Sequence, residues 1–214
     1  MGYRAIFGRE RDFEPELSVD LMRFRKRLFV DTFGWDLAVD GDRERDQFDT
    51  PSAIYCAVFC DRELVGMFRL IRTDGPYLSA SVFQDLALLD QFPKRSDAWE
   101  VSRFGVMAPD VRQASAVNHA MMFYFARTTA VRTLVAVTDL TYERALHQLG
   151  IRTRRYGPPG VVGIDRQGKP IQGVAGEIPM ALQGGLKFQR LIDLSNSVEI
   201  EDASHVFRHQ RVSA

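Results

Sequence analysis

The sequence has 214 residues, with 28 basic and 28 acidic side chains and a formal net charge of zero. Hydrophobic residues make up 45% and charged residues 26%, which excludes the disordered, collagen-like and disulfide-scaffold classes. No run of 18 apolar residues is present, and the N-terminus lacks the apolar core of a signal peptide. We therefore expect a cytoplasmic protein without a membrane partner, forming a single α/β domain over residues 1–214.

The chain begins with a strand, a helix and a long loop. Residues 3–8 predict the strand, and Pro15 suits the first turn of the helix, whose apolar residues recur every three or four positions until Gly34. Residues 35–50 are polar and predict the loop, and a loop of this length in a compact domain is usually functional or mobile.

Three strands and a second helix follow. Residues 54–60 and 63–72 predict strands joined by a tight hairpin, residues 79–89 a helix and residues 99–106 a further strand. The second half predicts a helix over 115–130 with Ser115 as its cap, a strand over 133–138 and a helix from Asp139 to Gly150. A basic strand over 152–156 and a Gly/Pro-rich turn region over 157–170 follow. The sequence then predicts a strand within 171–182 and a partly helical tail after 183.

The sequence offers no metal site. Cys56 and Cys60 lie four apart on one predicted strand, where they share a face but are too far apart to bridge, so we expect both to be reduced. The four histidines are scattered, and no set of ligands has the spacing that a metal ion needs. We expect no metal and no cofactor.

Several charged residues of the first half stand in apolar or loop settings. Arg69 lies inside an apolar strand, and Glu100 and Arg103 share another, where they point to opposite faces unless a bulge intervenes. Arg69 and Glu100 could instead form one structural ion pair. Arg25 could be a solvated helix charge, and the loop carboxylates could simply cap turns.

Charge is also segregated along the chain. Residues 1–107 carry a net charge of −4, whereas residues 110–190 carry +6. The second segment predicts a face for an acidic partner, and the alternative is an ordinary solvated surface rich in arginine. We expect no nucleic acid partner, because the basic residues are not interleaved with aromatic ones.

An ordered set of motifs covers residues 25–104: Arg25-x-x-x-Phe29, Gly34-Trp35, Glu44-Arg-Asp46-x-Phe-Asp49, Phe68-Arg69, Pro76-Tyr77, Phe83 and Trp99-Glu100-x-Ser-Arg-Phe104. Together these motifs resemble the acyl-homoserine-lactone synthases, the LuxI-type autoinducer synthases of bacterial quorum sensing. The resemblance implies a GNAT-like acyltransferase fold, with a mixed central β-sheet flanked by helices and an acyl-chain cleft. It also implies two substrates, S-adenosylmethionine and an acyl thioester, usually on acyl carrier protein. The products would be an N-acyl-homoserine lactone, methylthioadenosine and the free carrier thiol.

The resemblance also assigns roles to residues. Glu100 is the candidate base for the attacking amine, and Arg103 is the second candidate catalytic residue. Charged and aromatic side chains suit a substrate that carries an ammonium, a sulfonium and a carboxylate. The candidate S-adenosylmethionine-binding residues are Arg25, Phe29, Trp35, Asp46, Asp49, Arg69 and Phe83.

The acyl chain needs an apolar pocket. In the family, one strand position tends to be Thr in synthases that make 3-oxo products, and Ala136 aligns with it, so we expect a product without a 3-oxo group. The candidate pocket residues are Phe104, Met107, Met122, Ala136, Leu140 and Leu146.

The donor is expected to be acylated acyl carrier protein, with acyl-coenzyme A as the other possibility. Residues 106–115 contain no glycine, which weakens a phosphate cradle for coenzyme A. The candidate residues for docking the acidic carrier are Arg144, Arg152, Arg154 and Arg155. Two other functions stay open at this point: a GNAT-type N-acyltransferase acting on a different amine, and a non-catalytic binding module.

Overall fold

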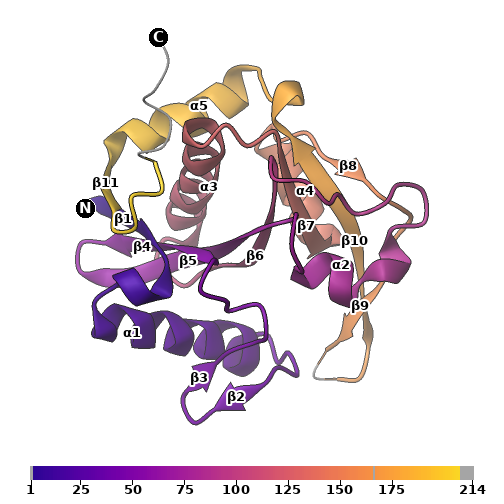
Figure 1. Cartoon of the computed structure of the whole chain (residues 1–214), viewed down its shortest axis with the longest axis horizontal. Helices are drawn as coiled ribbons and strands as arrows, with labels where there is room; N and C mark the ends of the chain where they lie inside the picture. Colours follow the sequence, from indigo (N-terminus) through magenta and orange to yellow (C-terminus); the bar gives the residue numbers. More distant parts are fainter. Residues whose placement is uncertain (1, 166, 208–214) are drawn as a thin grey trace.

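A nine-stranded mixed sheet forms the centre of the computed structural model, which describes residues 2–165 and 167–207 (Figure 1). The strands run in the order β11-β1-β4-β5-β6-β7-β10-β8, and β9 pairs with β10. Their bounds are β1 Tyr3–Gly8, β4 Ile54–Cys60, β5 Glu63–Arg72, β6 Ala98–Val106, β7 Thr133–Asp139, β8 Arg154–Arg155, β9 Gly160–Ile164, β10 Pro170–Pro179 and β11 Val198–Asp202. A separate hairpin pairs β2 (Val39–Asp40) with β3 (Arg43–Glu44).

Helices cover both faces of the sheet (Figure 1). The longer helices are α1 Pro15–Arg25, α3 Val111–Thr128, α4 Leu140–Gln148 and α5 Leu186–Leu194, and α2 is the short helix Leu78–Val82. One apolar cluster packs α1 and α2 on the first face, and we call this the α1 face. A second cluster packs α3, α4 and α5 on the other side, which we call the α3 face.

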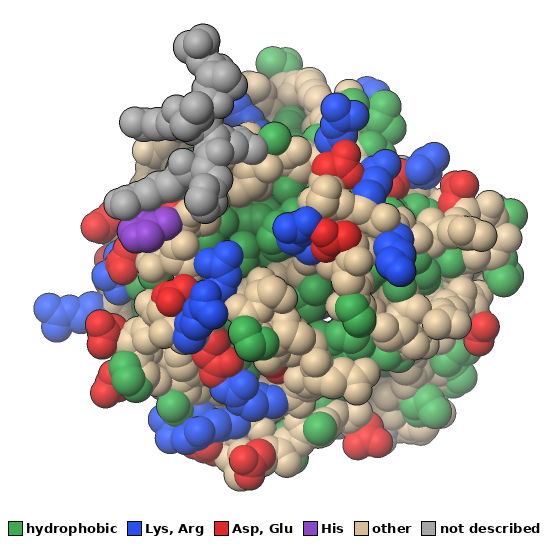
Figure 2. Space-filling view, viewed as in Figure 1, with side chains coloured by type: hydrophobic (Ala, Val, Ile, Leu, Met, Phe, Trp, Pro, Cys, Tyr) green, Lys and Arg blue, Asp and Glu red, His purple; other side chains and the backbone are tan. Residues whose placement is uncertain are grey.

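The sheet opens between β6 and β7. These two strands pair in parallel only from Ala98 to Glu100, opposite Thr133 to Val135. Beyond that point residues 136–139 of β7 become half-exposed, although the strand lies inside the sheet between β6 and β10. The exposure of an interior strand indicates that β6 and β7 diverge and leave an opening between the two faces. In the view of Figure 2 the middle of the surface is hollowed, and apolar side chains show there.

A β-bulge in β6 sets the direction of its side chains. Met67 pairs with Gly105 and Arg69 with Ser102, so Phe68 alone opposes both Arg103 and Phe104. Arg103 takes a left-handed backbone conformation, with φ of 50°. The extra residue shifts the alternation, so that Arg103 joins Glu100 and Ser102 on the α1 face. The bulge therefore brings together two charges that a regular strand would separate.

Several predicted boundaries were wrong. The helix expected at 115–130 begins at Val111, because Asp110 rather than Ser115 caps it by accepting a hydrogen bond from Gln113 N. The helix expected over 79–89 is only α2 and a short 3-10 turn. The turn region over 157–170 contains β9, and the basic strand over 152–156 shrinks to two residues. The tail holds α5 as expected but also β11, which pairs with β1.

Other features agree with the sequence. The hairpin of β4 and β5, the helix starting at Pro15 and the Asp139 cap of α4 are confirmed. Cys56 and Cys60 are both free. No helix within the described part of the chain has the length and apolar character needed to cross a membrane.

Candidate active site

The helix that carries Arg25 ends in an unusual turn. After Arg25 the backbone continues as a π-helix over Lys26–Thr32, which carries Phe29 into the core. π-Helical segments are rare and often occur at functional sites. Phe29 stacks on Trp35 with ring centroids 5.1 Å apart, and Trp35 stays about one-third exposed at 37%. The pair forms an aromatic wall at the edge of the α1 face.

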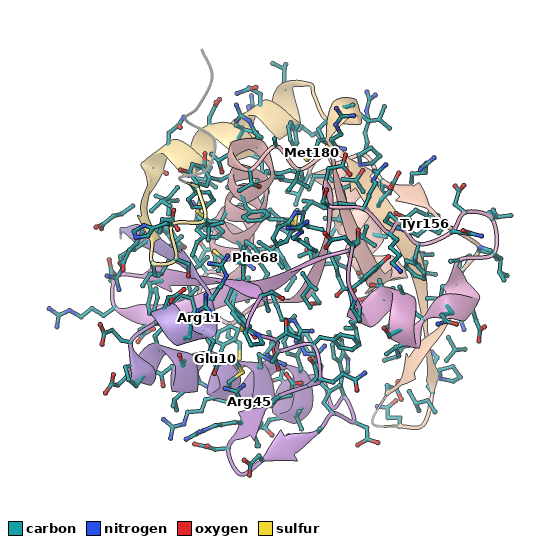
Figure 3. All side chains as sticks on the ribbon, viewed as in Figure 1. Glu10, Arg11, Arg45, Phe68, Tyr156 and Met180 are labelled. Carbon is teal, nitrogen blue, oxygen red and sulfur yellow. The ribbon has the colours of Figure 1, made fainter. Side chains whose placement is uncertain are left out.

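The polar loop of residues 35–50 is folded and anchored. Its β2–β3 hairpin brings Glu44 against α1, where the side chain is fully buried. Arg45 forms an ion pair with Glu10, and the two lie together on the outer side of this region (Figure 3). Asp46 and Asp49 then close a short turn in which Asp46 N donates to Asp49. The loop thereby points three carboxylates toward the sheet.

These carboxylates meet three arginines. Arg25 donates to Glu44 Oε2 at 2.5 Å and to Asp49 Oδ1 at 2.6 Å. Arg69 donates to Asp46 Oδ1 at 2.6 Å and to Asp49 Oδ1 at 2.7 Å. Arg103 donates to Glu44 Oε1 at 2.9 Å and forms an ion pair with Asp46 at 2.8 Å. We call the six residues Arg25, Glu44, Asp46, Asp49, Arg69 and Arg103 the charged cluster.

The charged cluster is balanced, with three positive and three negative groups, and nearly all of it is buried. The least buried side chains of the cluster are Asp46, at 16% exposed, and Arg103, at 6%. Burial by itself would raise the pKa of Asp49, but Arg25 and Arg69 outweigh it and hold the pKa well below its usual range. The pKa values of Asp46 and Glu44 are lowered too, because their arginine partners likewise outweigh burial. All three carboxylates are therefore ionised at neutral pH.

Glu100 lies on the same face with neutral partners. Its carboxylate accepts hydrogen bonds from Ser79 N at 2.6 Å, Ser79 Oγ at 2.5 Å and Leu78 N at 3.1 Å, all at the start of α2. Burial raises the pKa of Glu100 above its usual range, although the hydrogen bonds from Ser79 oppose the shift. Arg69 pairs with the loop carboxylates instead, so the alternative of a structural Arg69–Glu100 ion pair is wrong. A buried carboxylate with a raised pKa is suited to accept a proton.

The remaining candidates for the amine substrate lie around this cluster. Arg103 sits over the ring of Phe29, with its guanidinium carbon 5.9 Å from the centroid. Phe83 is half-buried at the end of α2 and packs against the core of the α1 face. The solvated position considered for Arg25 is wrong, because its side chain is fully buried.

Most candidate acyl-pocket residues gather on the opposite face. Phe104 and Met122 belong to the core of the α3 face, as does Leu146. Ala136 and Leu140 are half-buried at the opening between β6 and β7 and at the start of α4. Met107 packs with the core of the α1 face and is not brought together with the others.

The four candidate docking arginines divide into two pairs. Arg154 bonds Glu177, and Arg155 bonds Glu143 through Nε at 2.7 Å and Nη2 at 2.5 Å. Both arginines are thus paired with carboxylates of the protein, and their side chains remain exposed. Arg144 and Arg152 are exposed, and neither side chain forms an ion pair with the described residues.

Sequence reasoning missed several members of the site. Glu44 was noted only as part of a motif, yet it is the buried partner of both Arg25 and Arg103. Ser102, which bonds Arg69, was likewise noted only as part of a motif, and Ser79, which bonds Glu100, carries no signal that separates it from other serines. Within residues 2–165 and 167–207, no group of three His, Cys, Asp or Glu side chains could hold a metal ion.

Comparison with known proteins identifies the family. Residues 11–166 match the family described as Autoinducer synthase. The chain belongs to the autoinducer synthase family. An acyl-homoserine-lactone synthase of Aeromonas salmonicida is 32% identical over 149 residues, which are 66% of this chain and 72% of that protein. The enzyme is therefore an acyltransferase of the quorum-sensing autoinducer synthases.

Solved structures agree with this assignment. The chain is similar to TofI, described in a ternary complex with an inhibitor and MTA, at 26% identity and a TM-score of 0.73 over 89% of this chain and 96% of TofI. BjaI, a CoA-dependent acyl-homoserine lactone synthase with SAM and isopentyl-CoA, shares the fold at 21% identity and a TM-score of 0.77 over 94% of both chains. A putative N-acetyltransferase of Lactobacillus plantarum shares it at 16% identity and 0.54, over 83% of this chain and 99% of that one. The predicted GNAT-like fold is confirmed.

Proposed function

We propose that this synthase acylates the amine of S-adenosylmethionine from an acylated carrier protein and then closes the lactone, releasing methylthioadenosine. One observation carries the proposal. The charged cluster and Glu100 lie on the α1 face, beside the opening between β6 and β7, while the apolar pocket residues other than Met107 lie on the other face or at the opening. A polar amine substrate and an apolar acyl chain can thus approach the same stretch of β6 from opposite sides.

The least buried side of the charged cluster would bind S-adenosylmethionine. Asp46 and Arg103 lie on that side, and they carry the charges that an ammonium or sulfonium and a carboxylate require. Arg25, Arg69 and Asp49 are buried behind them and fix their positions. Phe29 and Trp35 would flank the adenosyl group, and Phe83 would approach from α2. In the TofI complex, the related enzyme is described with MTA.

Glu100 would serve as the base for N-acylation. A free α-amine has a pKa of about 8, so about a tenth is neutral at pH 7, and modest assistance by a carboxylate suffices. The proton would leave the amine nitrogen as it attacks the thioester carbon, either directly to Glu100 or through one water. Backbone N–H groups of residues 103–106, where β7 no longer pairs with β6, would stabilise the oxyanion together with Arg103.

Lactonisation would follow on the same scaffold. The substrate carboxylate attacks its own γ-carbon, and the C–S bond of the sulfonium breaks to release the neutral thioether methylthioadenosine. The leaving group is already activated, so the protein mainly has to hold the methionyl chain in a folded conformation. The rigid charged cluster suits that task because its six groups restrain one another.

The acyl chain would cross the sheet beside Phe104 and Ala136 and end among Met122, Leu140 and Leu146. The small Ala136 offers no hydroxyl donor to a ketone, which supports a product without a 3-oxo group.

Carrier protein is favoured over coenzyme A by charge at the start of α3. The Asp110 carboxylate occupies the helix N-terminus, where a phosphate would otherwise bind. A surface pocket beside it is lined by Asp61, Glu63 and Asp110 against the single Arg62. This environment repels the phosphates of coenzyme A. BjaI is described as CoA-dependent, so the donor must be tested directly.

The docking surface would combine Arg144 and Arg152 with α5. Lys187 Nζ donates to Gln148 O at the end of α4, the helix that carries Arg144, and Arg152 follows Gln148 by four residues. Leu186 is 82% exposed beside them. An acidic carrier with an apolar contact fits this surface.

The experiment is a donor panel with mass spectrometry of both products. Purified protein receives S-adenosylmethionine and acyl groups of one length on carrier protein or on coenzyme A. We expect equal amounts of methylthioadenosine and acyl-homoserine lactone, with a higher kcat/KM for carrier protein. If neither product appears with any donor although the protein is folded, an N-acyltransferase for another amine is favoured, and a higher kcat/KM for coenzyme A would overturn the carrier assignment.

A further inference from the structure

A polar pair, the buried His119 and the half-buried Tyr142, lies among the apolar residues of the α3 face. His119 of α3 is 1% exposed, and the ring of Tyr142 of α4 lies beside it, with centroids 5.7 Å apart and planes 20° from parallel. Phe104 contacts both rings, at 4.5 Å from His119 and 5.7 Å from Tyr142. Phe104 also stacks on Phe68, which lies near the centre of the view in Figure 3. The proposed function gives this pair no role.

The hydrogen bonds of the pair fix where its protons lie. His119 Nδ1 lies 2.7 Å from Ser115 O, and because a carbonyl oxygen only accepts, Nδ1 carries the proton. Burial lowers the pKa of His119 to about 4, so the ring is neutral and Nε2 has a free lone pair. Tyr142 Oη lies 2.7 Å from Nε2 and must donate to it. Burial also raises the pKa of Tyr142, which keeps the phenol protonated.

The pair therefore presents only an acceptor. The one proton of the Tyr142 hydroxyl is directed at His119, and the oxygen keeps lone-pair capacity for one more hydrogen bond. A ligand hydroxyl could donate to this oxygen. A ligand ketone could not, because it would bring a second acceptor against the first.

The position of the pair matches the start of the acyl chain. Phe104 follows Arg103 in the bulge, and the two side chains lie on opposite faces of the sheet. A thioester carbonyl near Arg103 therefore places the next few carbons beside Phe104, where Tyr142 and His119 lie. Acyl thioesters formed during chain elongation carry oxygen at C3, as a ketone or as a hydroxyl.

We infer that the Tyr142 hydroxyl, oriented by His119, accepts a hydrogen bond from a hydroxyl at C3 of the acyl chain and thereby selects 3-hydroxyacyl over 3-oxoacyl donors. This inference rests on the proposed path of the acyl chain and deepens it. Ala136 lacks the hydroxyl that a Thr at this position would donate to a ketone, and Tyr142 offers an acceptor to which a hydroxyl can donate. The expected order of donors of equal length is 3-hydroxy, then unsubstituted, then 3-oxo.

The test compares kcat/KM for these three donors, on one carrier, in the wild type and two variants. Tyr142→Phe should lower kcat/KM for the 3-hydroxy donor about 10-fold, while the unsubstituted donor stays within about twofold. His119→Leu removes the acceptor and frees the phenolic proton, so the preference should move toward the 3-oxo donor. Tyr124→Phe removes a hydroxyl elsewhere on α3 and serves as the matched control, with no change in preference.

A structural role for the pair predicts a different result. If Tyr142→Phe slows all three donors by the same factor, or if the wild type prefers the 3-oxo donor, the inference is overturned. Calorimetric binding of the three acyl-homoserine lactones separates this inference from the proposed reaction. Tighter binding of the 3-hydroxy lactone that disappears in Tyr142→Phe supports the pair even when turnover fails, and equal binding of the three lactones refutes it.

Discussion

The two faces of the sheet differ in the interactions that stabilise their buried side chains. On the α1 face, six ionised groups are taken out of water and balanced against one another within 2.5–3.8 Å. On the α3 face the same strand, β6, contributes Phe104 to an apolar core beside the His119–Tyr142 pair. Charges need exact partners and tolerate little change, whereas apolar packing tolerates substitutions of similar volume. We therefore expect the α1 face to carry chemistry and the α3 face to carry substrate preference.

The largest effect is expected at Glu100. Glu100→Gln keeps the size of the side chain and removes the base, so kcat should fall about 10²- to 10⁴-fold. Binding of S-adenosylmethionine, measured by calorimetry, should be preserved. A folded variant with undiminished turnover would exclude Glu100 as the base.

Glu100→Gln should raise the stability of the fold at neutral pH, although it lowers kcat. Because the folded-state pKa of Glu100 is raised, the native state binds its proton more tightly than the unfolded state, and the charged form costs stability at neutral pH. Glu100→Gln should therefore raise the free energy of unfolding at pH 7, measured by urea denaturation. A loss of stability at pH 7 would show that the hydrogen bonds from Ser79 outweigh burial.

Breaking the charged cluster should destabilise the fold more than any change on the α3 face. Arg69→Met leaves Asp46 and Asp49 without one of their partners, and losing one member of a buried ion pair typically costs about 3–5 kcal/mol. Urea denaturation of Arg69→Met beside Met122→Leu, a change of similar volume on the α3 face, measures the difference. Equal losses in both variants would contradict the contrast between the faces.

Acid should destabilise the protein through the charged cluster of the α1 face. The pKa values of Glu44, Asp46 and Asp49 are lowered in the folded state, so their contribution is fully present above the unfolded values of about 4. It is lost as pH falls from there toward the folded values. The free energy of unfolding of the wild type should therefore drop steeply below about pH 4. Arg69→Met should show a shallower drop, and parallel curves for the two proteins would refute the assignment.

Much of this contrast was readable from sequence, and the exceptions have physical reasons. The ordered motifs of residues 25–104 identified the family and every arginine of the charged cluster. They did not reveal that Glu44 is buried, because a loop residue belongs to no periodic pattern and only tertiary packing buries this side chain. The direction of Arg103 depends on a bulge that strand alternation cannot reveal. His119 and Tyr142 lie 23 residues apart on two helices, and only the packing of α3 against α4 joins them.

A moderate effect is expected at Ala136. Ala136→Thr places a hydroxyl donor at the half-exposed edge of β7 and should raise the relative kcat/KM of a 3-oxo donor about 10-fold. The measurement is a competition between 3-oxo and unsubstituted donors of equal length. An unchanged ratio in the folded variant would remove Ala136 from the selection of the chain.

The smallest effect is expected at the surface. Arg144→Glu and Arg152→Glu together reverse two charges that have no ion-pair partner among the described residues, and they should raise KM for carrier protein several-fold with kcat unchanged. Since exposed charges are screened by salt, the difference from the wild type should shrink as ionic strength rises. Arg62→Glu, on the β4–β5 hairpin, reverses an exposed charge away from this surface and is the control. If that control raises KM equally, net charge rather than the Arg144–Arg152 surface attracts the carrier.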